Sequence, residues 1–441
     1  MAATKQPTSV TIRSYQVGFG DCFLVSFNYG EDGKAERRHV LIDFGSTGLP
    51  AKGGFSLDAV AKDIKEKAAG KLTAVVATHR HRDHISGFGG KTGQVIADLN
   101  PDVVVQPWTE DPLAQPGATA PTGALKGAKG FVGALASMHD VARFSLQEAA
   151  ALRAPKTVKE QIAFLGDDNL ANLDAIKTLM DMKGEHVYAY YGIKSGLEKV
   201  LPGVKVHVLG PPTLKQSHAI EKQRDEDRDE FWHLQAKAAQ RAAATGKPLF
   251  PRATQVTGSV LPVETRWFLP RIEAVRGDQL LEIVRILDKA MNNTSVILLF
   301  EVGAKKLLFP GDAQLENWMY SLKEAKEASA VRKLLSKVDV YKVGHHGSLN
   351  ATPKTLWNLF QRKNADEHKK GRLQTIVSTM AGKHGSVDRG TEVPRSKLVQ
   401  ALKTDSTFAT TQSLTSKSAL CLTISIPVQV ADRAASRSHH A

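Results

Sequence analysis

The sequence predicts an α/β fold: one domain built on two β-sheets and interrupted by two mostly helical insertions. Short runs rich in Val, Ile and aromatic residues alternate with segments whose apolar residues recur at helical spacing. The 42% hydrophobic content of the 441 residues is sufficient for a sizeable core. No apolar stretch approaches the ~20 residues that a membrane-spanning helix needs, so no membrane association is expected.

The N-terminal part contains four predicted strands and one predicted helix. Residues 9–18, 22–30 and 38–45 are rich in β-branched and aromatic residues, with glycine at the breaks. Residues 55–70 have apolar positions at helical spacing and end in glycine. Residues 72–78 are apolar throughout, which indicates a strand that is buried on both faces.

Residues 107–200 and 213–290 are expected to be insertions in this domain. The first is rich in Ala and Leu at helical spacing, and the second contains a charged helix over 220–246. Such a charged face is either solvated or a surface for a protein partner. Residues 204–212, between the insertions, are expected to form a strand.

Strands and helices alternate again to the end of the domain, which we expect to span residues 1–430. Residues 431–441 contain few apolar side chains and are expected to be a disordered tail. The expected strands are 294–303, 305–312, 338–344, 373–379, 408–413 and 419–430, and the expected helices are 314–337, 352–363 and about 395–403.

The composition restricts the cellular setting and the partners. The formal net charge of +14 fits a polyanionic partner, although a merely soluble basic surface would give the same value. Cys22 and Cys421 lie in apolar strand-like runs, so buried thiols are expected in place of a disulfide. The first ten residues lack the apolar core of a secretory signal, and a cytoplasmic location is expected.

The segment "THRHRDHISG", residues 78–87, directly follows the apolar run and concentrates metal-ligating side chains. Imidazole and carboxylate are ligands that Zn²⁺ accepts readily. In an extended loop, His79 and His81 point the same way and can bind one metal ion. Asp83 and His84 turn away from that pair and can bind a second ion.

Two further strand ends offer the ligands that a metal pair needs. "KKLLFPGDA" ends in Asp312, a candidate bridging carboxylate that follows Gly311. "VDVYKVGHHGS" ends in His345 and His346, one of which would complete the ligands of the second metal.

These motifs resemble the metallo-β-lactamase fold superfamily, whose signature is H-x-H-x-D-H. The blocks "VHVLGPP", "NNTSVILLFEVG", "LLFPGDA", "VYKVGHHGS" and "TIVSTMAG" are similar, in this order, to the hydrolase domain of ComEC-like DNA-uptake proteins. The resemblance covers most of the chain apart from the two insertions, and it corresponds to a stand-alone version without the membrane channel of that family.

The resemblance implies an αββα sandwich with a dinuclear metal site, usually Zn²⁺ and sometimes Mn²⁺. By the family pattern, His79 and His81 bind the first metal and Asp83 and His84 the second, with Asp312 as the bridge. Many members add a third histidine to the first metal. The corresponding slot near "VLGPP" has none after the strand, so the first site is expected to be weak.

The paired histidines receive different roles from the same pattern. His346 is the favoured ligand of the second metal, and His345 would face the substrate and stabilise the leaving group; the reverse assignment stays open. Asp83, Asp312 and His345 are therefore the candidate catalytic residues.

Several other residues are weaker candidates for contacts with the substrate or with the ligands. Asp21 has either such a role or plain turn chemistry, and Asp43 either supports a ligating histidine or is a buried structural carboxylate. The arginines at 80 and 82 contact the substrate or pair with neighbouring acidic residues. The candidates for substrate contact are Asn293, Ser295, Lys383 and His384.

The function expected from these features is metal-dependent hydrolysis, with a hydroxide activated by two metal ions. The basic surplus and the ComEC-like blocks favour a phosphodiesterase, in particular a nuclease that acts on DNA or RNA. The first alternative is a hydrolase of small molecules such as a lactone, a β-lactam, a phosphocholine ester or a cyclic nucleotide. The second is a partner-binding module with a degenerate metal site, in which residues 213–290 contact a protein.

Overall fold

The computed structural model divides the chain into two units. The first comprises Met1–Asp111, Asn172–Gln216 and Asn292–Ala441, and the second Pro112–Ala171 and Ser217–Met291. The structure describes residues 5–30, 36–112, 121, 156, 172–217, 291–348, 352–383, 392–416 and 419–428. The second unit lies almost wholly outside these residues, so the fold presented below is that of the first unit.

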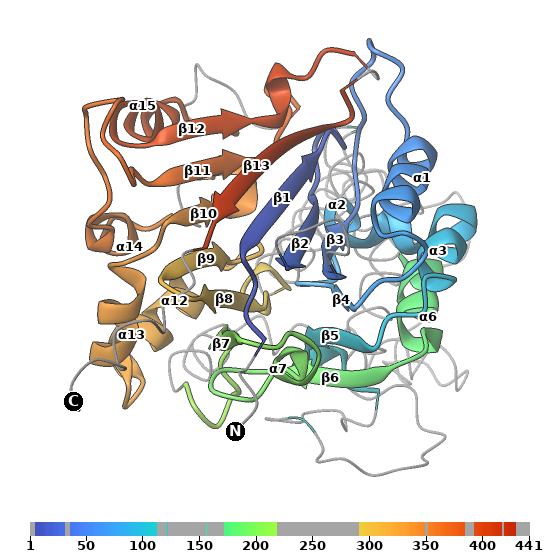
Figure 1. Ribbon diagram of the computed structural model, residues 1–441, viewed down its shortest axis with the longest axis horizontal. Helices are drawn as coiled ribbons and strands as arrows, with labels where there is room; N and C mark the ends of the chain where they lie inside the picture. The colour runs from blue at the N-terminus through green and yellow to red at the C-terminus, as the bar shows by residue number, and fades with distance from the viewer. Residues whose placement is uncertain are drawn as a thin grey trace, which may run out of the picture. The chain divides into compact units, whose positions relative to one another are not determined.

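The first sheet has seven strands in the order β13-β1-β2-β3-β4-β5-β6 (Figure 1). Strands β13, β1, β2 and β3 pair antiparallel, and β3, β4, β5 and β6 pair parallel. Their bounds are Ser9–Tyr15 (β1), Cys22–Tyr29 (β2), Glu36–Phe44 (β3), Ala74–Val76 (β4), Val103–Pro107 (β5), Glu185–Ala189 (β6) and Cys421–Pro427 (β13).

The second sheet has six strands in the order β12-β11-β10-β9-β8-β7. The strands from β9 to β12 pair parallel, and β7, β8 and β9 pair antiparallel. Their bounds are Val204–Gly210 (β7), Ile297–Val302 (β8), Lys305–Phe309 (β9), Val340–Lys342 (β10), Gln374–Val377 (β11) and Thr407–Thr410 (β12). Both sheets are therefore mixed.

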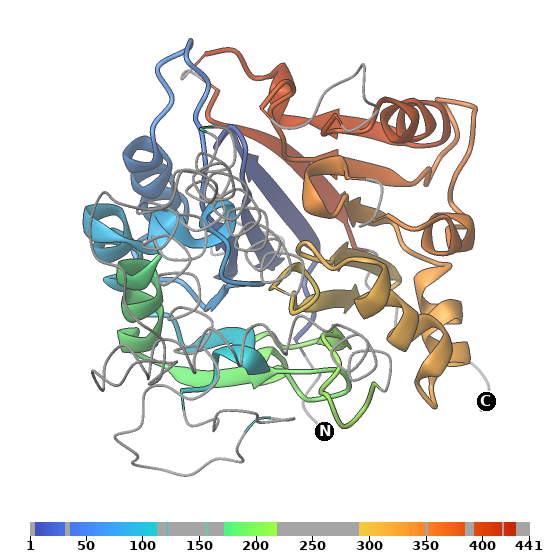
Figure 2. The same cartoon turned by 180° about the vertical axis from the view of Figure 1, so that it is seen from behind.

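Helices cover the outer face of each sheet (Figure 2). On the first sheet these are α1 (Leu57–Lys67), α3 (Gly90–Ala97) and α6 (Leu173–Asp181). On the second sheet they are α12 (Leu315–Met319), α13 (Ala328–Leu335), α14 (Lys354–Leu359) and α15 (Ser396–Asp405). Two short helices, α2 (Arg82–Ile85) and α7 (Leu197–Val200), follow strand ends in the first half of the chain.

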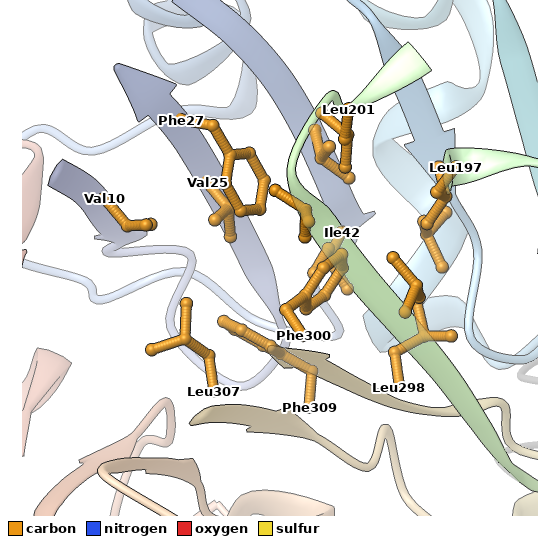
Figure 3. Packing of buried hydrophobic residues seen from close by; sticks show 14 of the residues in the cluster. Val10, Val25, Phe27, Ile42, Leu197, Leu201, Leu298, Phe300, Leu307 and Phe309 are labelled. Atoms are coloured by element: carbon orange, nitrogen blue, oxygen red, sulfur yellow. The ribbon is translucent and has the colours of Figure 1, made fainter. Parts of the chain in front are cut away.

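The inner faces of the two sheets pack against each other and form the central core (Figure 3). The ring of Phe23 on β2 lies 5.8 Å from that of Phe309 on β9, and Phe27 lies 5.6 Å from Phe300 on β8. In β2, for example, Phe23, Val25 and Phe27 face this core and Cys22 and Leu24 face the outer helices, as the two-residue period of a β-strand requires. The predicted α/β class with two sheets is thus confirmed.

Two expectations about local structure are wrong. The predicted insertion over 107–200 extends too far, because Glu185–Ala189 forms β6 and pairs with β5. The single helix expected over 314–337 is divided into α12, a π-helical turn and α13, with an extended backbone at Ala325. Buried Tyr320, Leu322 and Ala325 pack under the second sheet at this break, so tertiary packing overrides a continuous helix propensity.

Other expectations concern residues whose structure is not described. The charged helix over 220–246 and the tail 431–441 lie outside the described residues.

Both cysteines are free thiols, but only Cys22 is buried. Cys421 on β13 is partly exposed, which corrects the expectation for that residue. In the part of the chain that the structure covers, no helix has the length and apolarity needed to span a bilayer.

His39 on β3 gives the fold a specific dependence on pH. Its side chain is 5% exposed, and its Nδ1 lies 2.8 Å from the Ser26 hydroxyl. Burial, reinforced by Arg37 and Arg13, lowers the pKa of His39 from 6.5 to about 4. The unfolded state therefore binds this proton more tightly than the folded state does. Stability is unaffected by His39 above about pH 6.5 and is lost as the pH falls from 6.5 to about 4.

We predict that His39→Gln removes this loss. Between pH 6.5 and 4, the free energy of unfolding of the variant should rise relative to that of the wild type by up to ~3 kcal/mol. Urea titrations at a series of pH values measure this difference. A difference that does not change with pH would show that His39 is not the group responsible.

Candidate metal centre

The candidate site lies where the parallel strands of both sheets end. The carboxyl ends of β3 and β4 in the first sheet meet those of β9, β10 and β11 in the second. Two hydrogen bonds join the sheets at this edge: the Val296 amide, just before β8, donates to the Thr78 carbonyl at 2.9 Å, and the Ser378 hydroxyl donates to the Gly20 carbonyl, just before β2. Carboxyl ends of strands are the usual place for a site in α/β sheets.

Asp83, His84, Asp312 and His346 form one group of possible metal donors at this place. Each offers one atom, and these atoms all lie within 4.8 Å of one another. His84 Nε2 is 3.1 Å from Asp312 Oδ2, and His346 Nε2 is 2.8 Å from Asp83 Oδ2 and 3.7 Å from Asp312 Oδ2. Three of the four are fully buried, and the Asp83 side chain is 14% exposed.

The other ring nitrogen of each histidine is held by an acceptor. His84 Nδ1 lies 2.8 Å from Asp43 Oδ2, and Asp43 also accepts hydrogen bonds from the amide and hydroxyl of Thr78. His346 Nδ1 donates to the Ser378 carbonyl at 3.0 Å, because a carbonyl oxygen only accepts. In their neutral forms both rings would then direct the Nε2 lone pair at carboxylate oxygens.

Such an arrangement of lone pairs requires a positive charge between the groups. In the absence of a metal ion, a proton supplies it. Burial alone would lower the pKa of His84, but the carboxylates of Asp312, Asp43 and Asp83 outweigh burial and raise that pKa well above its usual value. The pKa of His346 is raised by the same balance. Two imidazoles and two carboxylates that already require a shared cation fit a divalent metal ion such as Zn²⁺.

His79 and His81 form a second, smaller pair beside this group. His79 Nε2 lies 3.0 Å from His81 Nδ1, and the ring of His79 lies 4.1 Å from that of His84. Burial and the neighbouring His84 and His81 lower the pKa of His79 well below its usual value, which keeps its lone pair available. Among the residues that the structure describes, no third His, Cys, Asp or Glu joins the pair in a donor group.

The turn that carries His345 and His346 has a strained backbone. Both residues have positive φ, 43° and 52°, a left-handed conformation that costs of order 1–3 kcal/mol for a non-glycine residue. The His345 amide donates to Asp312 Oδ1 at 3.0 Å, which fixes the turn against the donor group. His346 points inward, whereas His345 is 28% exposed with its Nε2 4.0 Å from Asp312 Oδ2. Of the two histidines, it is His346 that belongs to the donor group.

A buried ion pair lies directly behind the donor group. The Lys342 ammonium pairs with Asp21, donates to the Gly311 carbonyl at 3.1 Å and lies 3.6 Å from Asp312 Oδ1. Asp21 in turn lies 3.7 Å from Nδ1 of both His84 and His346. Burial would lower the pKa of Lys342, but Asp21 and Asp312 outweigh it and raise that pKa above its usual range. Asp21 thus lies beside two of the candidate metal ligands, His84 and His346, and does not only form part of a turn.

Lys342 is the residue beside the candidate centre that the sequence did not point to. The signal for it was a single lysine within the run "VDVYKVG", whose other residues are mostly apolar. A lysine in a buried strand needs a partner of opposite charge, so this lysine by itself indicated a buried ion pair.

Three backbone segments approach closely to hold α2, which carries Asp83 and His84. The Asp21 amide donates to the Asp83 carbonyl at 2.9 Å, and the Gly45 amide donates to the Asp21 carbonyl at 3.0 Å. A Cβ atom on Gly45 would lie 2.5 Å from the backbone nitrogen of His84, closer than real Cβ atoms approach. Glycine at this position is therefore a condition for the placement of two candidate ligands.

The arginines of the motif differ in their surroundings. Arg80 is buried, its Nε lies 3.7 Å from Glu110 Oε1, and its carbonyl accepts a hydrogen bond from Asn172. Of the two readings left open for Arg80, the structure therefore supports pairing with an acidic residue. Arg82, the first residue of α2, is exposed.

Of the four residues expected to contact a substrate, Ser295 is the one that the structure shows in contact with the donor group. Ser295 accepts a hydrogen bond from the Asp312 amide at 3.2 Å and so positions a candidate ligand. Asn293 donates to Glu316, and Lys383 is exposed and lies beside Gly48. His384 lies outside the described residues.

In comparisons with protein-family models and with curated proteins, nothing matches this chain. The chemistry of the site is therefore argued from its own residues. Their arrangement can bind a divalent cation and keep both histidine rings in one orientation.

We predict that Asp43→Asn weakens metal binding about 10–100-fold, because the His84 ring loses a charged acceptor at Nδ1. Asparagine also tolerates the positive φ of 55° at this position. Competition with a chromophoric chelator measures the affinity. Asp339→Asn is the matched control, since Asp339 is a buried aspartate that pairs with Lys305 and Arg362 and not with the centre. Equal losses in both variants would contradict a specific role for Asp43.

We also predict that Gly45→Ala lowers the free energy of unfolding by ~1–3 kcal/mol and weakens metal binding, because the added methyl group displaces α2. Gly89→Ala is the control: φ is −87° there, and an added Cβ meets nothing closer than 3.3 Å. Urea titration and chelator competition give the two quantities. If Gly45→Ala destabilised the fold but left the affinity unchanged, the proposed coupling to α2 would be wrong.

Proposed function

We propose that this protein is a metal-dependent hydrolase of the metallo-β-lactamase fold superfamily that acts on phosphodiesters, with a nucleic acid as the substrate. The observation that carries the proposal is the convergence of Asp83, His84, Asp312 and His346 at one edge of a two-sheet α/β domain. Two of these residues come from the H-x-H-x-D-H motif. The other two come from strand ends of the opposite sheet.

In this proposal each residue has a definite task. Asp83, His84, Asp312 and His346 would hold one ion, and His79 and His81 would offer two nitrogens to another. A bound divalent cation would activate water and offset negative charge on the attacked ester. Asp43 and the Ser378 carbonyl can hold a proton on Nδ1 of His84 and His346, which leaves Nε2 of both rings free to act as a ligand.

His345 is the residue suited to the leaving group. Its imidazole is partly exposed and its Nε2 lies 4.0 Å from Asp312 Oδ2, so its ring can hold a proton at the edge of the centre. A proton on Nε2 can pass to the leaving oxygen as the ester bond breaks. The same position would let the imidazolium stabilise negative charge before the transfer.

The choice of a phosphodiester over other esters rests on charge and on the ComEC-like blocks. The net charge of +14 favours polyanions, and exposed Arg82 adjoins Asp83 at the centre. Arg80 adds nothing to this argument because it pairs with Glu110.

We predict that the purified protein contains one to two Zn²⁺ or Mn²⁺ ions per chain and hydrolyses bis-p-nitrophenyl phosphate and single-stranded DNA. Asp312→Asn should abolish hydrolysis while the circular dichroism spectrum remains that of the wild type. Asp339→Asn, which alters a buried aspartate outside the centre, should keep its activity.

Metal analysis and a substrate panel decide between this proposal and its alternatives. If the metal-loaded protein leaves both phosphodiesters intact but opens a lactone, it is a hydrolase of small molecules. If it binds no metal at all, the centre is degenerate and the hydrolase proposal is wrong.

A further inference from the structure

Among the residues that the structure describes, Lys342 is the single lysine whose side chain is buried, with 2% exposure. Strand β10 explains its direction. Val340 faces the core between the sheets and Tyr341 faces the outer helices, so Lys342 again faces inward. It is the last residue of β10 and therefore lies at the strand end that carries the donor group.

The two oxygens of Asp312 have different partners. Oδ1 accepts the His345 amide at 3.0 Å and lies 3.6 Å from the Lys342 ammonium. Oδ2 lies 3.1 Å from His84 Nε2 and 3.7 Å from His346 Nε2. Lys342 and the His345 amide thus engage one oxygen, and only the other faces the donor atoms.

Asp21 shows why a fixed cation is needed here. It is fully buried, and together with Asp43 and His84 it forms a second group of possible metal donors within 4.8 Å. A buried carboxylate at this place would attract a proton or a metal ion by itself. The ion pair with Lys342 satisfies Asp21 without either.

We propose that Lys342 is a positioning residue: a built-in cation that holds Asp21 and one oxygen of Asp312 out of the set of metal donors. This inference rests on the proposed metal centre. It has two consequences. First, the fixed charge of Lys342 lets the metal-free fold tolerate the buried carboxylates of Asp21 and Asp312. Second, a bound metal ion would be held less tightly than by these carboxylates alone, because the ion would be repelled by the positive charge of Lys342.

Four proteins test this inference: the wild type, Lys342→Met, Asp21→Asn and the double variant. Methionine has a similar length and no charge. Lys342→Met should lower the Tm of the metal-free protein and tighten Zn²⁺ binding roughly tenfold, because the repulsive charge is gone. Asp21→Asn should have the opposite effect on affinity, a weakening of roughly tenfold, because Lys342 then lacks its neutralising partner.

The double variant removes one charge of each sign. Its affinity for Zn²⁺ and its metal-free Tm should return towards those of the wild type. Lys306→Met is the matched control, since Lys306 on the neighbouring β9 is mostly buried and pairs with Glu301 at 3.3 Å. It should leave the affinity unchanged. If Lys342→Met does not fold, the wild type, Asp21→Asn and the double variant still give the comparison.

The outcomes separate this inference from the proposed function. If the wild type binds no Zn²⁺, the metal centre is wrong, and the inference about Lys342 falls with it. If the wild type binds Zn²⁺ but Lys342→Met binds it equally or more weakly, the role of Lys342 is only packing, and the metal centre stands. A purely structural lysine would not give opposite signs for the two single variants, nor recovery in the double variant.

Discussion

Four carboxylates at one edge of the two sheets, three of them buried and that of Asp83 14% exposed, impose the main constraint on this structure. Burial of a charge without a partner costs far more than a domain can tolerate, so each carboxylate requires a cation or several hydrogen-bond donors. Asp43 takes two donors from Thr78 and the ring of His84. The other three, Asp21, Asp83 and Asp312, face Lys342 or His346. The same arrangement leaves one donor atom each of Asp83, His84, Asp312 and His346 within 4.8 Å of one another, which is close enough for a divalent cation to bind all four.

The two sheets are coupled through this ion network as well as through their core. The phenylalanines between the sheets provide burial, which is strong but not directional. The pairs Asp21–Lys342 and Asp83–His346 each join one sheet to the other, and they depend on the relative position of the strand ends. The apolar core therefore stabilises the packing of the two sheets, and the charged contacts add directional constraints between their strand ends.

The sequence predicted those parts of the site and fold whose signal is local. The ligand-type residues of "THRHRDHISG" and the strands around them follow from spacing and period. Lys342 and the Arg80–Glu110 pair were not assigned, because their partners are distant in the chain and only the fold brings them together. The prediction of one helix over 314–337 was wrong for a related reason. The sequence favours helix throughout, but packing against the sheet breaks the helix at Ala325.

If the proposed function holds, the exposure of the donor residues determines from which side a substrate approaches. His84, Asp312 and His346 are fully buried, while Asp83 and His345 are partly exposed. Under the proposed function, a reacting group would enter between α2 and the turn at His345, where Arg82 is also exposed. A phosphodiester has its charged oxygens on the periphery of the chain and can present them to such an edge. In the proposed hydrolase the strained turn has a purpose: its left-handed backbone keeps His346 buried among the candidate donors and His345 partly exposed, on the side from which an ester would arrive.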